Sequence, residues 1–238
     1  MSCNTWAQEL KWFKKSMEIK MGEVTPFKFE EIEDFDKHIN LSIPNYETLC
    51  NVFKGIVSEF AQPEGQVVDL GCSTGKFLAS LNHIEDCQYI GIDKVNIVEH
   101  ETINFIEGDI ESELFKMKQS DTKPSVLISM FTLQFLGVAK RKRVLHSLEH
   151  LVRFHGATLL IAEKVYLNDP KLQMLIHRMH ISEKRKNFTD KDILDKDTKL
   201  SVSMFCKTET EIEKELMQIG NVSKVWQSYN FMGFVVGQ

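Results

Sequence analysis

The sequence lacks the patterns that several common classes of protein require. Its 238 residues include five cysteines, an odd number with no C-x-x-C pair, which argues against a disulfide framework and against a bound metal. No apolar run approaches the length of a membrane span, and lysines interrupt the apolar pattern of residues 1–15. We therefore expect a cytoplasmic protein with reduced thiols, no signal peptide and no membrane contact.

Positive charge and the common nucleotide motifs are also missing. The formal net charge is −5 and the isoelectric point is about 5.9, so direct nucleic-acid binding is not expected. Neither G-x-x-x-x-G-K-[ST] nor G-x-G-x-x-G occurs, which disfavours ATP and NAD. The hydrophobic content of 42% and the charged content of 26% are typical of a soluble globular domain.

Strand and helix patterns alternate through the middle of the chain. Short apolar runs predict strands at 66–70, 88–93, 103–106, 125–131 and 157–163. Helical patterns cover 46–60 and 139–152, and another helix starts at 75–81. This alternation predicts an α/β fold with a parallel sheet and right-handed crossovers. A capping box at Thr208 and Glu211 begins a helix that ends at Gly220, and 222–229 with 231–236 predict a final antiparallel hairpin.

Two segments fall outside this rhythm. Residues 4–18 repeat apolar side chains at helical spacing, and we interpret residues 1–33 as an N-terminal helical extension. Residues 34–238 form the main domain, and residues 165–207 interrupt it with a helical insertion that could serve as a lid, a dimer contact or both.

The stretch from Gly71 to Gly75, GCSTG, has two interpretations. It matches G-x-S-x-G, the turn that presents the serine nucleophile of many hydrolases. A triad of Ser73 with Asp169 and His177 or His180 can be written down, but no local motif supports it. The stretch also matches a glycine turn that lets a nucleotide approach bare backbone at a helix start.

The nucleotide interpretation predicts acidic residues farther along the chain, and they are present. Asp93 ends the second strand, 22 residues after Gly71, where a carboxylate would accept ribose hydroxyls. Asp109 follows the third strand, where an adenine amino group would be met. Gly71 and Gly75 allow close backbone approach. With the strand order and the terminal hairpin, this pattern indicates S-adenosylmethionine (SAM).

Four segments then resemble one family, the carboxy-S-adenosyl-L-methionine synthases, which have a class I methyltransferase (Rossmann-like) fold. They are SIPNY at 42–46, DLGCSTG at 69–75, IEGDI at 106–110, and FTLQFL at 131–136 followed by Glu163-Lys164. The resemblance runs collinearly from about residue 34 to residue 238. It implies a mostly parallel seven-stranded sheet with the C-terminal antiparallel hairpin, a SAM pocket at the carboxyl ends of the strands, and a homodimer.

The resemblance also implies a reaction and a set of site residues. A proton leaves the sulfonium methyl group of SAM, prephenate loses carbon dioxide, and the ylide captures it. The product, carboxy-SAM, serves wobble-uridine modification in tRNA. The expected cofactor-binding residues are Tyr46, Asp69, Gly71, Cys72, Ser73, Gly75, Asp93, Lys94, Asp109, Ile110, Met130 and Phe131.

The chain departs from the family at two positions. Met130 stands where the family has Asn, and Lys196-Asp197 stands where the family has a Lys-Arg step whose Arg holds the new carboxylate. Lys196 or Lys199 could replace that Arg as a point charge, and these two lysines are the catalytic candidates. A methyltransferase acting on another acceptor, and a SAM-binding protein without turnover, therefore remain alternatives.

Other polar clusters have ordinary interpretations. We expect solvent exposure for His146, His150 and His155, for His177 and His180, and for the basic runs 140–143 and 184–186.

Overall fold

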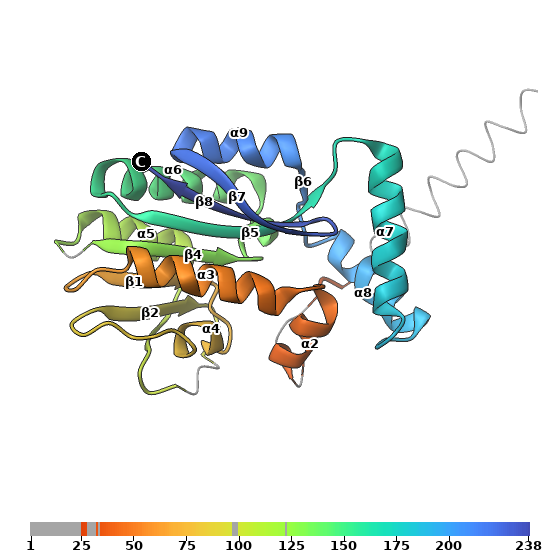
Figure 1. Cartoon of the computed structure of the whole chain (residues 1–238), viewed down its shortest axis with the longest axis horizontal. Coiled ribbons are helices and arrows are strands. Elements are labelled where there is room, and N and C mark those ends of the chain that lie inside the picture. The colour runs from red at the N-terminus through yellow and green to blue at the C-terminus, as the bar shows by residue number, and fades with distance from the viewer. Residues whose placement is uncertain (1–24, 28–31, 33, 97–99, 122) are drawn as a thin grey trace, which may run out of the picture.

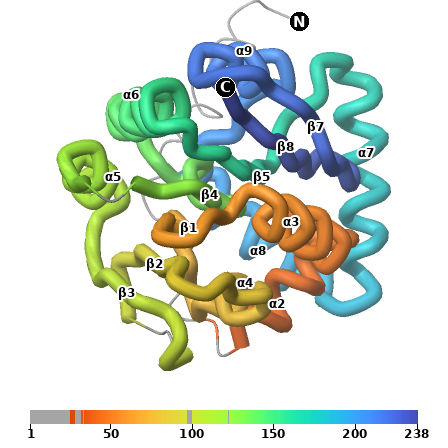
Figure 2. Tube along the Cα trace, turned by 60° about the vertical axis from the view of Figure 1, so that its left-hand side comes forward, coloured from red at the N-terminus to blue at the C-terminus, as the bar shows by residue number. Residues whose placement is uncertain are grey.

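The computed structural model describes residues 25–27, 32, 34–96, 100–121 and 123–238. The expected helix at 4–18 lies outside these residues. A twisted sheet crosses the molecule in the order β3-β2-β1-β4-β5-β8-β7 (Figures 1 and 2). Its parallel strands are β1 (Gln66–Leu70), β2 (Gln88–Asp93), β3 (Asn104–Glu107), β4 (Pro124–Met130) and β5 (Thr158–Tyr166). The strands β7 (Asn221–Ser228) and β8 (Phe231–Gly237) add the antiparallel hairpin, and the two-residue β6 (Lys207–Thr208) pairs with the end of β5.

Helices cover both faces of the sheet because both faces are apolar. One face packs against α5 (Ile110–Gln119), α6 (Val138–His155) and α9 (Glu209–Ile219), with Leu114, Leu148 and Leu216 fully buried. The other face packs against α3 (Tyr46–Phe60) and the short α4 (Lys76–Ala79), with Leu49 and Phe53 fully buried. The expected α/β fold is confirmed: helices cover both faces of a mostly parallel sheet that ends in an antiparallel hairpin, and β6 lies off the main path of strands.

A third group of helices gathers at one end of the sheet. These are α2 (Phe35–Ser42), α7 (Pro170–Lys184) and α8 (Asp190–Ser201), together with the 3-10 turn η2 (Leu133–Phe135). Figure 1 shows α2, α7 and α8 at the end toward which the parallel strands point. The predicted insertion at 165–207 supplies α7 and α8. Helix α2, which no sequence pattern singled out, is the third member.

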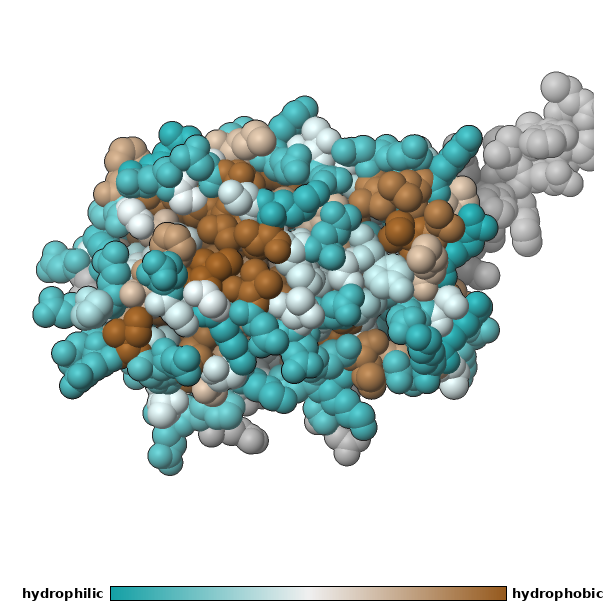
Figure 3. Space-filling model, viewed as in Figure 1, coloured by the Kyte–Doolittle hydropathy of each residue, from teal (hydrophilic) through white to brown (hydrophobic). Residues whose placement is uncertain are grey.

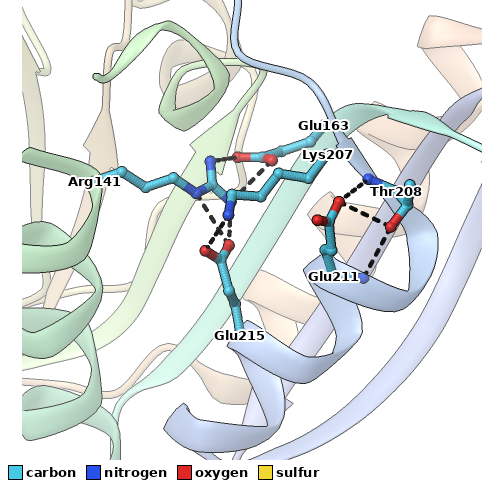
Figure 4. A network of polar contacts seen from close by, with 6 residues as sticks. All are labelled: Arg141, Glu163, Lys207, Thr208, Glu211 and Glu215. Carbon is cyan, nitrogen blue, oxygen red and sulfur yellow. Dashed lines mark hydrogen bonds and ion pairs between the residues drawn. The ribbon is translucent and has the colours of Figure 1, made fainter. Parts of the chain in front are cut away.

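A buried ion network holds the insertion to the sheet where the chain returns from it (Figure 4). The Arg141 guanidinium donates to both oxygens of Glu163, at 2.7 and 3.1 Å, and to Glu215 at 2.9 Å. Lys207 of β6 lies 2.7 Å from the other Glu215 oxygen. Arg141 is 2% exposed, which contradicts the expectation that the whole run 140–143 is solvated. Its two carboxylate partners, the buried Glu163 and the half-buried Glu215, explain why this basic side chain lies inside the protein.

The surface carries one further feature at the insertion. Helix α7 exposes apolar side chains, among them Leu172, Leu175 and Met179, and apolar side chains gather at that end of the face seen in Figure 3. Among the residues that the structure describes, none of the helices combines the length and apolar character that crossing a bilayer requires.

Candidate functional site

The turn after β1 brings backbone amides to the carboxyl end of the sheet. Gly71 has φ +83°, and a Cβ there would lie 2.4 Å from Thr132 Oγ1, so only glycine fits. Ser73 also has a left-handed backbone, with φ +50°. Gly75 is the N-cap residue of α4, with φ +74°. The sequence GCSTG thus forms a tight loop held against the sheet.

Asp93 closes the next strand and is tied to this loop. One carboxylate oxygen accepts from the Ser73 amide at 2.8 Å, and the other accepts from the Lys94 amide at 2.7 Å. The two bonds fix the carboxylate while leaving further acceptor positions on each oxygen. A carboxylate held in this way at the end of β2 can accept two neighbouring hydroxyl groups.

A cavity of about 440 Å³ opens above these strand ends. Of the twelve predicted cofactor-binding residues, seven line it: Gly71, Ser73, Asp93, Lys94, Ile110, Met130 and Phe131. The volume lies within the usual range for small-molecule sites. Apolar side chains next to the carboxylate form a wall on which a flat base can lie.

The other five predicted residues lie beside the cavity. Tyr46 packs behind Phe131, with ring centroids 6.3 Å apart. Cys72 is buried under Gly91, where a Cβ would lie 2.7 Å from its Sγ. Burial, together with the nearby Asp93 carboxylate, raises the pKa of Asp69 to about 7. Gly75 caps α4, as described above.

Asp109 is the fifth of these residues, and its carboxylate is bound by other groups of the protein. It is the N-cap of α5, where one oxygen accepts from the Glu111 amide at 3.0 Å, and its other oxygen forms an ion pair with Lys140. Although partial burial opposes the effect, the Lys140 ammonium lowers the pKa of Asp109. Ile110 and Lys140, which adjoin Asp109, do line the cavity.

Three lysines reach the end of the cavity farthest along the strands. They are Lys164 from β5, Lys184 from α7 and Lys196 from α8. Lys184 lies 3.3 Å from Asp197, whereas within the described residues neither Lys164 nor Lys196 has a carboxylate partner. Such a cluster of buried and half-buried cations favours an anionic ligand.

The surroundings of Lys196 weaken its positive charge. Its Nζ donates to Ser42 Oγ at 2.9 Å and contacts His38 Nε2. Burial and the neighbouring Lys184 ammonium lower the pKa of Lys196 to about 7. Burial also lowers the pKa of His38 to about 4, with a further contribution from Lys196. An anion placed here would favour the protonated form of Lys196.

Two expectations about exposure are wrong at this end of the cavity. His180 is 2% exposed and its Nε2 lies 3.0 Å from the Ser42 carbonyl oxygen, while Lys184 is 7% exposed. His180 and Lys184 are one helical turn apart on α7, and both lie on the side of the helix that faces α2 and α8. The run EKRK at 183–186 is typical of a solvated surface. Lys184 is buried only because α2, α7 and α8 pack around it.

The structure also shows where the catalytic candidates Lys196 and Lys199 lie, and where Asp197, at which the chain departs from the family, lies relative to the cavity. Lys196 lines the cavity, whereas Lys199 lines only a smaller neighbouring one. Asp197 binds Lys184 and is absent from the cavity wall. Its negative charge therefore offsets one lysine and does not face the ligand directly.

The hydrolase triad does not assemble. Asp169 caps α7 by accepting from the Lys171 and Leu172 amides, and His180 is bonded to the Ser42 carbonyl. His177 is exposed on α7, and neither it nor Asp169 lines the cavity that Ser73 lines, so the Ser73 loop lacks the partners that a nucleophile needs.

The residues present fit SAM. In a SAM complex, Asp93 would offer acceptors to ribose hydroxyls, Ile110 and Phe131 would offer apolar walls to adenine, and the Gly71 turn would leave the backbone open to the methionine part. Helix α2 covers this turn, because Asp36 accepts from Thr74 Oγ1 at 3.2 Å and lies 3.7 Å from Lys76.

Comparison with known proteins agrees with this geometry. The family model of FtsJ-like methyltransferases matches residues 52–211. A carboxy-S-adenosyl-L-methionine synthase from Idiomarina loihiensis is 30% identical over 226 residues, covering 89% of this chain and 93% of that protein. A carboxy-S-adenosyl-L-methionine synthase from Pseudomonas aeruginosa is 28% identical over 233 residues, with 89% and 93% covered.

Solved structures share the fold. An O-methyltransferase family protein from Burkholderia thailandensis superposes with a TM-score of 0.55 at 11% identity, covering 97% of this chain and 70% of that one. The small RNA methyltransferase HEN1 gives 0.53 at 16% identity, covering 82% of this chain and 26% of that one. The family model and the carboxy-S-adenosyl-L-methionine synthase relatives make SAM the cofactor or substrate and the protein a transferase. The chain belongs to the carboxy-S-adenosyl-L-methionine synthase family, within the class I methyltransferase superfamily.

Proposed function

We propose that this protein converts SAM and prephenate to carboxy-SAM, and that the product serves wobble-uridine modification in tRNA. The observation that carries the proposal is one cavity that has a carboxylate toward one end and a cluster of lysines at the other. Asp93 lies at one end, and Lys164, Lys184 and Lys196 lie at the other. An adenosyl sulfonium compound needs the first end, and a carboxylate needs the second.

The proposed chemistry balances within these ligands. SAM supplies an acidic sulfonium methyl group, which gives up a proton, and prephenate supplies carbon dioxide, which bonds to that carbon. The lysines lower the free energy of carboxylate groups as the carbon dioxide is transferred. The ring hydroxyl of prephenate leaves as hydroxide and takes up the proton as water. Side chains of α2, α7 and α8 line the cavity at this end, beside the proposed exchange.

The direct test is incubation of purified protein with SAM and prephenate, followed by mass spectrometry of the nucleoside products. We expect a SAM derivative heavier by one carboxylate group, formed only when both substrates are present. A protein that binds SAM but never yields this product would contradict the proposal.

A second candidate is methyl transfer to another acceptor, and two observations favour it. Asp197 neutralises Lys184, and Met130 lines the cavity where the family has Asn. Under this alternative, S-adenosylhomocysteine would accumulate with an acceptor in place of carboxy-SAM. A third alternative, SAM binding without turnover, predicts neither product. The same mass-spectrometric assay separates all three.

A further inference from the structure

The base end of the SAM cavity presents a lysine where the sequence predicts a carboxylate. Asp109 is expected to meet the adenine amino group, yet it does not line the cavity, whereas Ile110 and Lys140 do. One oxygen of Asp109 accepts from the Glu111 amide at 3.0 Å, and the other is bonded to the Lys140 ammonium. On the side that faces a ligand, this ion pair therefore shows its cationic member.

A second ion pair holds Lys140 in this place. Arg143, one turn farther along α6, donates from Nε and Nη2 to the two oxygens of Glu111, at 2.6 and 3.1 Å. Two parallel contacts thus join the start of α6 to the start of α5, Lys140 with Asp109 and Arg143 with Glu111. The hydrogen bond from Arg143, and to a smaller extent the nearby Lys140 ammonium, lowers the pKa of Glu111. Two carboxylates at the start of α5 therefore hold the head of Lys140 beside the cavity.

The rest of the lining does not replace the missing acceptor. Within the described part of the chain, Asp93 is the only carboxylate that lines the cavity, and ribose hydroxyls would occupy it. Gln134 also lines the cavity, but its side-chain oxygen accepts from the Lys164 amide at 2.8 Å. At the base end the lining offers Lys94 and Lys140. Because an ammonium group only donates hydrogen bonds, this end is complementary to an acceptor on the base.

We propose that Lys140 is a specificity-determining residue, which makes the base end accept a purine with an oxygen at position 6 at least as well as adenine. Such a 6-oxo purine places a carbonyl acceptor where adenine places an amino donor. The Lys140 ammonium donates to that carbonyl, whereas it occupies the Asp109 oxygen that an amino group would need. This selectivity belongs to the SAM cavity and does not depend on the proposed carboxyl transfer.

The exposure of the ion pair sets the size of the effect. The Lys140 and Asp109 side chains are 25% and 36% exposed, so solvent screens their interactions in part. A hydrogen bond to a charged group at such a site changes affinity by about tenfold, which is less than a fully enclosed polar site achieves. A change of this size is well within the range that calorimetry resolves.

Isothermal titration of the full-length protein with two probes tests the assignment. S-adenosylhomocysteine carries adenine, and S-inosylhomocysteine differs in the base alone, with an oxygen at position 6 and a proton on N1. We expect wild type to bind S-inosylhomocysteine within about threefold of S-adenosylhomocysteine, or more tightly. In Lys140→Met the ammonium is lost and Asp109 is released, so S-inosylhomocysteine should bind about tenfold or more weakly than S-adenosylhomocysteine.

Two further variants separate base recognition from general damage to the fold. Lys142→Met, on the exposed side of α6 and outside the cavity, should leave the ratio of the two affinities unchanged. Asp109→Ser keeps a side-chain cap for α5 and removes the carboxylate, and it should not shift the ratio toward adenine. Each ratio compares two ligands on one variant, so an overall loss of binding-competent protein cancels.

Two results would overturn the assignment. One is a wild-type preference for S-adenosylhomocysteine of more than about threefold, which Asp109→Ser would abolish if the carboxylate reads the amino group in spite of Lys140. The other is an unchanged ratio in Lys140→Met. The proposed function fails on a different measurement, because formation of carboxy-SAM from SAM and prephenate neither requires this selectivity nor excludes it.

Discussion

Replacement of Asp93 should weaken SAM binding more than any other single change at the strand ends. In Asp93→Ala, the two ribose hydroxyls lose a charged acceptor, at about 1.5–3 kcal/mol for each hydrogen bond. Two such bonds correspond to a dissociation constant about 10² to 10⁴ times larger. The same carboxylate also orders the glycine turn through the Ser73 amide, at 2.8 Å, so the estimate includes some loss of preorganisation. Asp93→Asn keeps one acceptor oxygen and should lie between wild type and Asp93→Ala.

Isothermal titration with S-adenosylhomocysteine measures this effect without turnover. Glu107→Ala is a matched control, because Glu107 is the register partner of Asp93 on β3 and is exposed outside the cavity. Urea denaturation checks that both variants are folded. A folded Asp93→Ala protein whose affinity stays within about threefold of wild type would refute the assignment of the ribose end.

Three further predictions concern stability and the cationic end. Arg141→Ala leaves buried Glu163 without its partner and should lower the free energy of unfolding by about 3–5 kcal/mol, measured by urea denaturation, whereas exposed Lys142→Ala should change little. Burial, with the Lys184 charge, lowers the pKa of His180 from 6.5 to about 4, so the unfolded chain binds a proton in this window that the folded protein does not. Stability should therefore fall as the pH drops from about 6.5 to 4, and less steeply in His180→Gln than in wild type or His177→Gln. Asp197→Arg removes the carboxylate that offsets Lys184 and should tighten binding of carboxy-SAM by about tenfold relative to SAM, with Asp195→Arg as control. Equal affinities would mean that the charge at position 197 has no effect on the ligand.

The sheet was predictable because its signal is local. Strands at 66–70 and 88–93 begin and end where the sequence pattern places them, and the capping box at Thr208 begins α9 as expected. Helix α5 was missed, because Ile110, Leu114 and Met117 provide its buried face within a polar segment of only ten residues. Helix α2 was missed for a related reason: it buries only Ser42, and tertiary contacts position it.

The two ends of the candidate site differ in the same way. The nucleoside end could be predicted from motif spacing. Gly71 and Asp93 lie at the carboxyl ends of adjacent parallel strands, so they come close together in the fold. The cationic end draws Lys164, Lys184 and Lys196 from three elements whose packing no periodicity specifies. His180 and Lys184 are separated by four residues on one helix, which places them on one side, but nothing in the sequence says whether that side faces solvent or protein.

The arrangement of the lysines has a consequence for how the family can diversify. Under the proposed function, the sheet and its glycine loop would hold the nucleoside that the family shares. The wall that would select the second reactant comes from α7, α8 and the short helix α2, which reaches α8 through Lys196 and His38 across 158 positions of sequence. Mutations in the insertion can thus exchange one reactant for another while the scaffold and its grip on the nucleoside stay intact. Grafting residues 165–207 from a relative onto this sheet would transfer selectivity in a single block.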